Sequence, residues 1–355
     1  MKIPTLQIGS ITASVPIIQG GMGVRVSLSS LAAAVAEEGA IGTISSIGLG
    51  DKDASTTDYE KVSREALERE IRKARTMTDG HLAVNFMGVL SNVDDLISAS
   101  VREGIKIIIY GAGIPAKLPS LVTDESVNLV PIVSSDRVTE LILRSWDKRY
   151  ERIPDALVLE GPLAGGHLGF SAEQLEEPEN YSLDVLLPTI LECIKPYEDK
   201  YGKKIPVIVG GGIYTGADIA RVLKAGASGV QMGTRFVCTE ECGVSDEFKQ
   251  AYLDAKEEDI VIIKSPVGLP GRAINNAFLK KLEKVDKIRF KCPYRCLTAC
   301  KVATAKYCIA DALVNAYFGD MDNGLIFCGQ NAYRINEITT VKKLIAELMD
   351  GVREA

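Results

Sequence analysis

Short apolar runs alternate with longer stretches of helical periodicity along most of the chain. Runs of four to six residues, rich in Val and Ile and without strict alternation, predict strands that are covered on both faces. Eight such runs occur, at residues 16–19, 40–44, 82–86, 105–110, 129–133, 156–159, 205–209 and 229–232. Helical patterns separate them, including a charged one over about 59–76 and another over 217–225. This alternation predicts a parallel α/β fold.

Eight βα units within about 250 residues match the usual size of a (β/α)8 TIM barrel. A doubly wound open sheet is the alternative, and the strand count favours the barrel. After Phe236 the pattern changes, and residues 239–355 read as helical, with a loop at 265–272 and a closing amphipathic helix at 340–352. We therefore predict a barrel domain over residues 1–280. A helical, cysteine-containing extension over 281–355 is expected to pack on or near the barrel mouth.

Composition and charge limit the kinds of partner that this protein could bind. The 355 residues are 46% hydrophobic and 25% charged, which suits one large globular domain. The net charge is −6 and no basic run occurs, which argues against a nucleic-acid partner. The first residues do not resemble a signal peptide, and no apolar segment of about 18 residues could span a membrane. We expect a cytoplasmic protein with reduced thiols.

Glycine-rich turns follow the last two predicted strands. Gly210, Gly211 and Gly212 follow the seventh strand, and Gly233 follows the eighth. Such turns expose backbone N–H groups near helix N-termini, a combination that binds a phosphate monoester late in a barrel, and Thr234 could add a hydroxyl donor. The alternative is that these glycines only make tight turns, but two clusters on consecutive strands favour the phosphate site.

The chain has two histidines, and their positions differ in meaning. His167 follows the sixth strand, among Gly165, Gly166 and Gly169. A histidine at the carboxyl end of a barrel strand can act as a general base, a general acid or a hydrogen-bond donor near neutral pH. His81 precedes the third strand, at the face that usually serves stability, so we interpret it as structural.

Four segments in this order resemble the nitronate monooxygenase family, once called 2-nitropropane dioxygenases, which includes the flavin-dependent enoyl-acyl-carrier-protein reductases. The segments are Pro16–Met22, Ala164–Gly169, Gly211–Ile213 and Gln231–Phe236. The resemblance covers about residues 1–280. Together the segments identify the superfamily, but they separate its members poorly.

The resemblance implies FMN in the barrel mouth, and it assigns residues by position. Gly21 and Met22 would lie along the isoalloxazine ring, and His167 matches the active-site histidine of the family. The other implied contacts are Asn85 and Glu160 at the polar edge or ribityl chain, Gly165 against the flavin, Gly211, Gly212, Gly233 and Thr234 at the phosphate, and Gln231 and Met232 beside them.

Three functions remain open at this stage. The first is oxidation of alkyl nitronates by O2, with FMN carrying the redox step. The second is an NAD(P)H-dependent enoyl-acyl-carrier-protein reductase. Glu160 favours this second function, because nitronate monooxygenases often have glutamine there and a small-acidic pair at Pro162-Leu163. The third is a non-catalytic, redox-sensing flavin protein. The catalytic readings imply a small-molecule substrate, and a homodimer is one oligomeric state open to the chain. A barrel like that of inosine-monophosphate dehydrogenase would need a nucleophilic cysteine after the sixth strand, where none occurs.

Cysteines gather in the predicted extension, at Cys292, Cys296, Cys300 and Cys308. We favour ordinary buried thiols, with a zinc or iron–sulfur site as the alternative. The spacing differs from the common C-x2-C zinc pattern. In one regular helix the outer thiols of residues 292–300 would lie about 12 Å apart, so a metal site requires irregular backbone there. Cys193, Cys238 and Cys242 read as packing residues, while Cys328 could approach the mouth.

Overall fold

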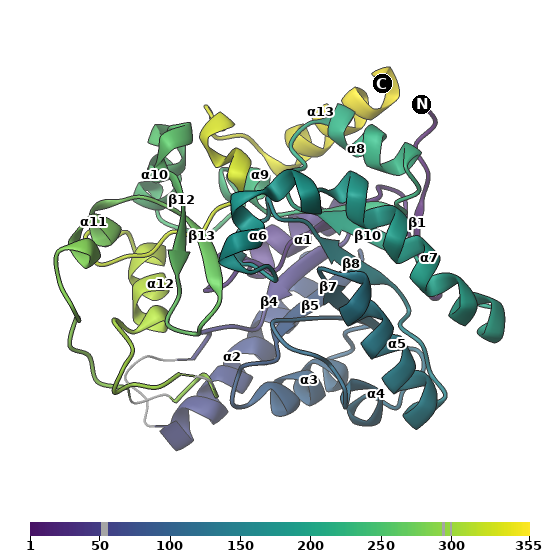
Figure 1. Ribbon diagram of the computed structural model, residues 1–355, viewed down its shortest axis with the longest axis horizontal. Coiled ribbons are helices and arrows are strands. Elements are labelled where there is room, and N and C mark those ends of the chain that lie inside the picture. Colours follow the sequence, from purple (N-terminus) through teal and green to yellow (C-terminus); the bar gives the residue numbers. More distant parts are fainter. Residues whose placement is uncertain (51–55, 293–294, 299) are drawn as a thin grey trace.

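The computed structural model describes residues 1–50, 56–292, 295–298 and 300–355. Within these residues, eight parallel strands form one sheet in the order β3-β11-β10-β8-β7-β6-β5-β4 (Figure 1). They are β3 (Ile17–Gln19), β4 (Gly42–Ser45), β5 (Leu82–Met87), β6 (Ile107–Gly111), β7 (Asn128–Val133), β8 (Leu157–Glu160), β10 (Val207–Gly210) and β11 (Gly229–Met232). The sheet also closes on itself, because Ile18 pairs in parallel with Ile41 and the N–H of Gln19 donates to the carbonyl of Ile41 at 2.9 Å. The predicted TIM barrel is confirmed.

Helices cover the outside of the barrel. Those between the strands are α1 (Ser29–Glu37), α2 (Thr56–Arg75), α3 (Val93–Arg102), α4 (Leu118–Leu121), α5 (Asp136–Tyr150), α6 (Ala172–Glu176), the 3-10 helix η1 (Pro178–Tyr181), α7 (Leu183–Tyr201) and α8 (Gly216–Lys224). The final helix, α13 (Val341–Glu354), packs against α8 and α1. The approach to α8 is close, since a Cβ on Gly216 would lie 2.3 Å from the carbonyl oxygen of Leu348. The division of the chain at residue 280 stays a prediction.

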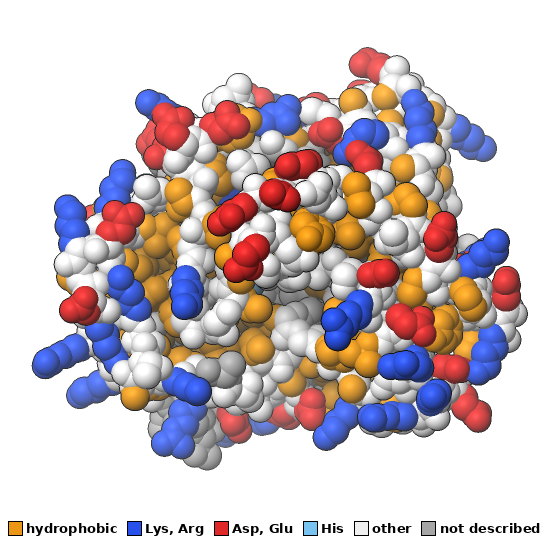
Figure 2. Space-filling model, viewed as in Figure 1, with side chains coloured by type: hydrophobic (Ala, Val, Ile, Leu, Met, Phe, Trp, Pro, Cys, Tyr) orange, Lys and Arg blue, Asp and Glu red, His pale blue; other side chains and the backbone are white. Residues whose placement is uncertain are grey.

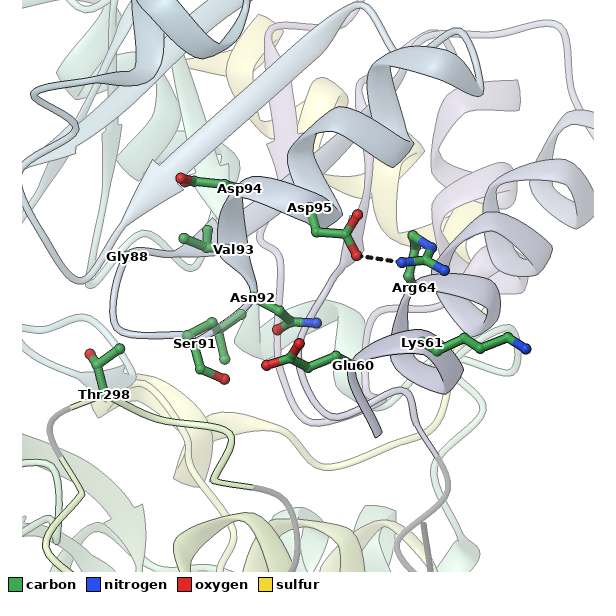
Figure 3. A pocket seen from close by; sticks show the side chains of 11 residues that line it. Glu60, Lys61, Arg64, Gly88, Ser91, Asn92, Val93, Asp94, Asp95 and Thr298 are labelled. Atoms are coloured by element: carbon green, nitrogen blue, oxygen red, sulfur yellow. Dashed lines mark hydrogen bonds and ion pairs between the residues drawn. The ribbon is translucent and has the colours of Figure 1, made fainter. Parts of the chain in front are cut away.

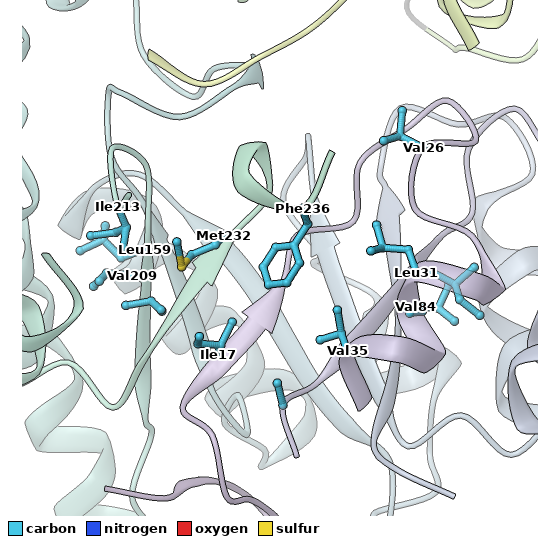
Figure 4. Close-up of a cluster of buried hydrophobic side chains, with 14 of the residues drawn as sticks. Ile17, Val26, Leu31, Val35, Val84, Leu159, Val209, Ile213, Met232 and Phe236 are labelled. Atoms are coloured by element: carbon cyan, nitrogen blue, oxygen red, sulfur yellow. The ribbon is translucent and has the colours of Figure 1, made fainter. Parts of the chain in front are cut away.

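Alternation along the strands separates two apolar layers. Residues such as Ile17, Val209 and Met232 face the helices and join the large cluster that also contains Phe236 (Figure 4). The next residues along the strands, such as Ile18, fill the barrel interior. Side chains of a strand point to opposite faces in turn. The last inward-pointing side chain of each strand therefore stands at the carboxyl end of the barrel interior, facing the mouth.

A short hairpin closes the amino end of the barrel. Strands β1 (Leu6–Ile8) and β2 (Ile11–Ala13) pair antiparallel. Leu6, Ile8 and Ala13 are buried in the same cluster as the interior residues of the barrel. This end is therefore sealed by apolar side chains, which leaves the carboxyl end for chemistry.

The region after β11 departs from the prediction. It contains the helices α9 (Thr234–Val237), α10 (Asp246–Asp254), η2 (Glu257–Asp259), α11 (Ala277–Glu283), α12 (Ile309–Tyr317) and η3 (Gln330–Arg334). It also contains strands β12 (Ile260–Lys264) and β13 (Pro270–Ile274), which form a three-stranded antiparallel sheet with β9 (Gly166–His167). The helical expectation was wrong here, because four β-branched residues, Ile260–Ile263, pair across a turn with β13. We call this sheet the cap sheet.

Among the residues described, no helix has the length and apolar character needed to cross a membrane.

Candidate functional site

Three polar residues end the strands at the barrel mouth. Asn85 in β5, Glu160 in β8 and Gln231 in β11 each follow a position that packs on the helix layer, so by alternation they face the interior. Beneath them the interior is apolar, with Ala83 and Val158 two residues earlier on the same strands. The floor of the mouth is thus a polar layer on an apolar base.

The loop after β3 lies directly against this layer. A Cβ on Gly21 would stand 2.2 Å from the Cβ of Asn85, so no side chain fits at this position. Met22 reaches toward Gly233, where an added Cβ would lie 3.2 Å from the methionine sulfur. The N–H of Gly20 donates to the carbonyl of Met232 at 2.8 Å, which fixes the loop to the end of β11. The first and last loops of the barrel are therefore adjacent, as the implied flavin site requires.

The predicted phosphate loops are tightly built. Gly211 has φ +102°, and a Cβ there would lie 2.8 Å from the carbonyl oxygen of Gly161. Gly212 has φ +83°. Side chains are thus excluded here by the positive φ angles and by the close approach of the loop after β8. Gly233 and Thr234 stand at the start of α9, directly after β11. Strand β11 pairs with β10, the strand that Gly211 and Gly212 follow.

The side chain of Met232 does not face the mouth, although the family resemblance places this residue beside the phosphate contacts. Its side chain is 3% exposed and packs in the core between the sheet and the helices, as Figure 4 shows. Only its backbone reaches the mouth, through the bond to Gly20. Any contact of Met232 with a cofactor would therefore come from backbone atoms.

A segment near the C-terminus crosses the glycine turns after β10 and β11, and the sequence analysis missed most of it. The N–H of Gly329 donates to Thr234 Oγ1 at 3.0 Å, and Asn331 Nδ2 donates to the carbonyl of Gly212 at 2.8 Å. The N–H of Gln330 donates to the carbonyl of Leu163 at 3.2 Å. The backbone of Cys328 lies against the loop after β8, because a Cβ on Gly165 would lie 2.5 Å from the carbonyl carbon of Cys328, while the Cys328 side chain is buried. Polar residues after an apolar run, here Gly329–Asn331, were the available signal.

Arg272 is a second residue that the sequence did not single out. It is 4% exposed, and its Nη1 donates to the carbonyls of Pro162, at 2.8 Å, and Ala164. The guanidinium therefore holds the glycine-rich loop after β8. Burial lowers the pKa of Arg272, and the neighbouring thiol of Cys328 and carboxyl of Glu160 act in the opposite direction.

His167 lies in the cap sheet above the mouth. Its Nε2 is 2.7 Å from Ser265 Oγ, and its ring meets Phe327 edge-on, with centroids 5.0 Å apart. Strand β9 pairs with β13, so that His167 lies opposite Gly271. Burial lowers the pKa of His167 to about 4, so the imidazole is neutral at neutral pH. Ser265 and Phe327 are further residues that the sequence alone did not identify.

Glu160 has an unusual carboxyl. Burial raises its pKa to about 7, and the Gly169 N–H and the Arg272 charge lower it by smaller amounts. The Gly169 N–H donates to Glu160 Oε2 at 3.1 Å, which folds the end of the loop back over the carboxyl. An acid with this pKa changes charge in the range where an enzyme works.

The second histidine and three of the cysteines lie where the sequence predicted structural roles. His81 Nε2 lies 3.1 Å from the carbonyl of Thr12, away from the mouth. Cys238 and Cys242 are buried, and Cys193 is half-buried beside Glu140.

A cavity of about 650 Å³ opens on the rim of the mouth, between α2, the loop after β5 and Thr298 (Figure 3). Glu60, Asp94 and Asp95 bring acidic groups to it, and Arg64 pairs with Asp95 at 2.8 Å. The strand ends with the predicted site residues do not line it, so this cavity is separate from the predicted site.

A closed parallel barrel with polar strand ends and glycine turns late in the chain has the architecture of barrel enzymes that bind a phosphate-bearing group. The family model described as "Nitronate monooxygenase" matches residues 5–351. The chain belongs to the nitronate monooxygenase family, whose members are flavin enzymes, and it is a flavin-dependent oxidoreductase.

Two curated proteins that resemble this chain have different names. "Probable nitronate monooxygenase" of Staphylococcus saprophyticus is 27% identical over 81% of this chain and 82% of that protein. "(3aS,4S,5R,7aS)-5-hydroxy-7a-methyl-1-oxo-octahydro-1H-indene-4-carboxyl-CoA dehydrogenase" of Rhodococcus jostii is 28% identical over 77% of this chain, and the match spans 66% of that protein.

Two solved structures share the fold. FabK from Thermotoga maritima has a TM-score of 0.72 and 27% identity, covering 96% of this chain and 94% of that one. Nitroalkane oxidase from Streptomyces ansochromogenes has a TM-score of 0.74 and 21% identity, covering 96% of each chain, which shows the fold alone.

The mouth fits a flavin. Among the described residues, Gln231 Oε1 is buried without a hydrogen-bond partner, and by alternation it faces the mouth. A buried oxygen of this kind is costly unless a ligand or water supplies a donor. Gly211 and Gly212 bring two positive-φ glycines directly after β10, next to β11, in the type of turn that exposes backbone N–H groups to an anion.

Proposed function

We propose that this enzyme binds FMN in the barrel mouth and oxidises alkyl nitronates with O2. The phosphate would be held by Gly211, Gly212, Gly233 and Thr234. The ring would lie along Gly21 and Met22, with Asn85, Glu160 and Gln231 at its polar atoms and Gly165 packed against it. When bound, the flavin supplies the electron-transfer chemistry that protein side chains lack.

The neutral His167 carries this proposal. At neutral pH an imidazole whose pKa is about 4 brings no positive charge to the site, but it can still exchange a hydrogen bond. Ser265 fixes the ring through Nε2, and Phe327 shields one edge from water. A neutral imidazole held in this way would orient the nitronate oxygens by a hydrogen bond from its protonated ring nitrogen.

The first test is an anaerobic reduction assay on the purified, FMN-loaded protein. Alkyl nitronate, NADH and NADPH are added separately, and the visible absorbance of the flavin is followed. The proposal expects a loss of absorbance with nitronate and none with either nicotinamide. A response to nicotinamide alone would overturn it, and a protein that takes up no FMN would remove its basis.

Glu160 favours a second candidate, an NAD(P)H-dependent enoyl-acyl-carrier-protein reductase. The carboxyl stands where the resemblance places glutamate in the reductases, and FabK is similar over nearly the whole chain. Rapid reduction by NADH or NADPH, followed by reoxidation with an enoyl thioester, would establish this activity instead. A homodimer and a cytoplasmic location stay predictions.

A further inference from the structure

Four of the eight cysteines line a single cavity of about 340 Å³ outside the barrel mouth. They are Cys292, Cys296, Cys300 and Cys308, and all four lie in the described part of the chain. Protein interiors are normally close-packed, so ordinary buried thiols would be expected to fill such a space together with their neighbours. Here four cysteine residues line the space instead.

One of the four cysteines stands at a helix start. Cys308 is the N-cap residue of α12, directly before the first turn of that helix. The free N–H groups and the dipole of a helix N-terminus stabilise a thiolate, which is the form of cysteine that binds iron.

The backbone between the cysteines is irregular, as a metal site requires. No described residue of 284–308 belongs to a helix or a strand of the sheets. Arg295, directly before Cys296, has φ +44°, an uncommon conformation for a residue with a side chain. The separation along a regular helix, which would keep the outer thiols apart, therefore does not apply.

The cysteine segment is fastened to the barrel. The N–H of Ser91 donates to the carbonyl of Cys296 at 3.1 Å, and the N–H of Thr298 donates to the carbonyl of Val89 at 2.9 Å. Leu90 and Leu297 pair between these bonds. The loop that follows β5 thus anchors one wall of the cavity.

Charge points to an anionic occupant. Residues 284–306 hold seven Lys or Arg and one acidic residue, Asp286, in a chain of net charge −6. Basic side chains gather along the edge of the molecule near α11 in Figure 2. Four thiolates around a metal centre carry excess negative charge, which cations nearby stabilise.

We propose that Cys292, Cys296, Cys300 and Cys308 hold an iron–sulfur cluster. The intervals of three, three and seven residues lack the C-x2-C pair of common zinc sites, and the cavity exceeds the needs of one ion. Among the described residues no three Cys, His, Asp or Glu side chains yet surround one point as ligands. Assembly therefore requires the thiols to rotate into the cavity and release their protons.

Anaerobic treatment of the protein with ferric iron, sulfide and dithiothreitol, which reduces part of the iron, tests this site. We expect about two or about four iron per chain with an equal amount of acid-labile sulfide, because both [2Fe–2S] and [4Fe–4S] clusters take four cysteine ligands. Dithionite reduction should then give an electron paramagnetic resonance signal of the reduced cluster. This signal should not depend on how much flavin the protein holds. The paired variant Cys296→Ala with Cys308→Ala should lose the iron and the signal.

The control is Cys193→Ala, which removes a half-buried thiol beside Glu140 and should leave the iron content unchanged. If the paired variant does not fold, Cys300→Ser, at the less buried end, should still lower the iron content. Iron retained by the cysteine variants, no iron after reconstitution, or zinc bound in its place would each overturn the proposal. Because FMN content and nitronate oxidation are measured separately, failure of this site is distinct from failure of the proposed function.

Discussion

Ser265 Oγ lies 2.7 Å from Nε2 of His167, although 98 residues separate them in the chain. The two meet because β9 adds to the hairpin of β12 and β13, so the cap sheet carries the histidine and its partner together. Ser265 is 3% exposed and also accepts the N–H of Val267 at 3.4 Å. The serine is thus a positioning residue for the imidazole.

Replacing this serine tests the role of the contact. Ser265→Ala should lower kcat/KM for nitronate by about tenfold, the effect of losing one hydrogen bond of roughly 1.4 kcal/mol. Steady-state oxygen consumption measures the rate, and flavin absorbance should show unchanged FMN content. Ser171→Ala, at the exposed start of α6, is the matched control. Unchanged kinetics in Ser265→Ala would contradict the positioning role.

Glu160 predicts a pH dependence. Because its pKa is about 7, the carboxyl becomes negative as the pH rises through 7. An anionic nitronate is then repelled, so kcat/KM should fall between about pH 6 and pH 8. Glu160→Gln should remove this fall and keep the rate near the wild-type value at low pH. The same inflection in the variant would assign the titration to another group.

The same carboxyl affects the pH dependence of stability. Its pKa is raised in the folded protein, from an ordinary value of 4.5, so the folded state holds the proton more tightly than the unfolded state. This contribution is fully present below about pH 4.5 and is lost as the pH rises through 7. The Tm of wild type relative to Glu160→Gln should therefore decline over that range. A difference that grows with pH would contradict the raised pKa.

The sequence predicted the barrel because each of its strands is a local apolar run with no polar face. The mouth residues followed from the same pattern, since they are the polar or glycine positions where those runs end, as with Glu160 after Leu159. Arg272 and Ser265 could not be found in this way. Their function depends on pairing between β13 and β9, a non-local contact that leaves no periodic signal. The segment at Gly329–Asn331 was missed although its polar residues follow an apolar run, because its contacts with Thr234 and Gly212 are non-local and nothing in the run itself indicates them.

Gly21 should be intolerant of any side chain. A Cβ would stand 2.2 Å from that of Asn85, both on backbone that the barrel fixes, so Gly21→Ala should destabilise by about 1–3 kcal/mol. It should also reduce FMN content, because the shifted loop carries Met22. Thermal unfolding and flavin absorbance measure the two effects. Gly243→Ala is the control, since the nearest atom to its added Cβ is Tyr317 Oη at 3.9 Å. Equal behaviour of the two variants would contradict the close packing.

Arg272 has two effects: its hydrogen bonds hold the loop after β8, and its charge lowers the pKa of Glu160. Two variants separate these effects. Arg272→Met leaves the carbonyls of Pro162 and Ala164 unpaired, at about 1–3 kcal/mol for each buried group, so stability and FMN content should fall. It also removes a charge that lowers the pKa of Glu160, so the pH inflection should move above 7. Arg272→Lys keeps the charge without the planar geometry. It should loosen the loop while leaving the inflection near its wild-type position. An inflection that stays in place in Arg272→Met would show that the guanidinium acts on the loop alone.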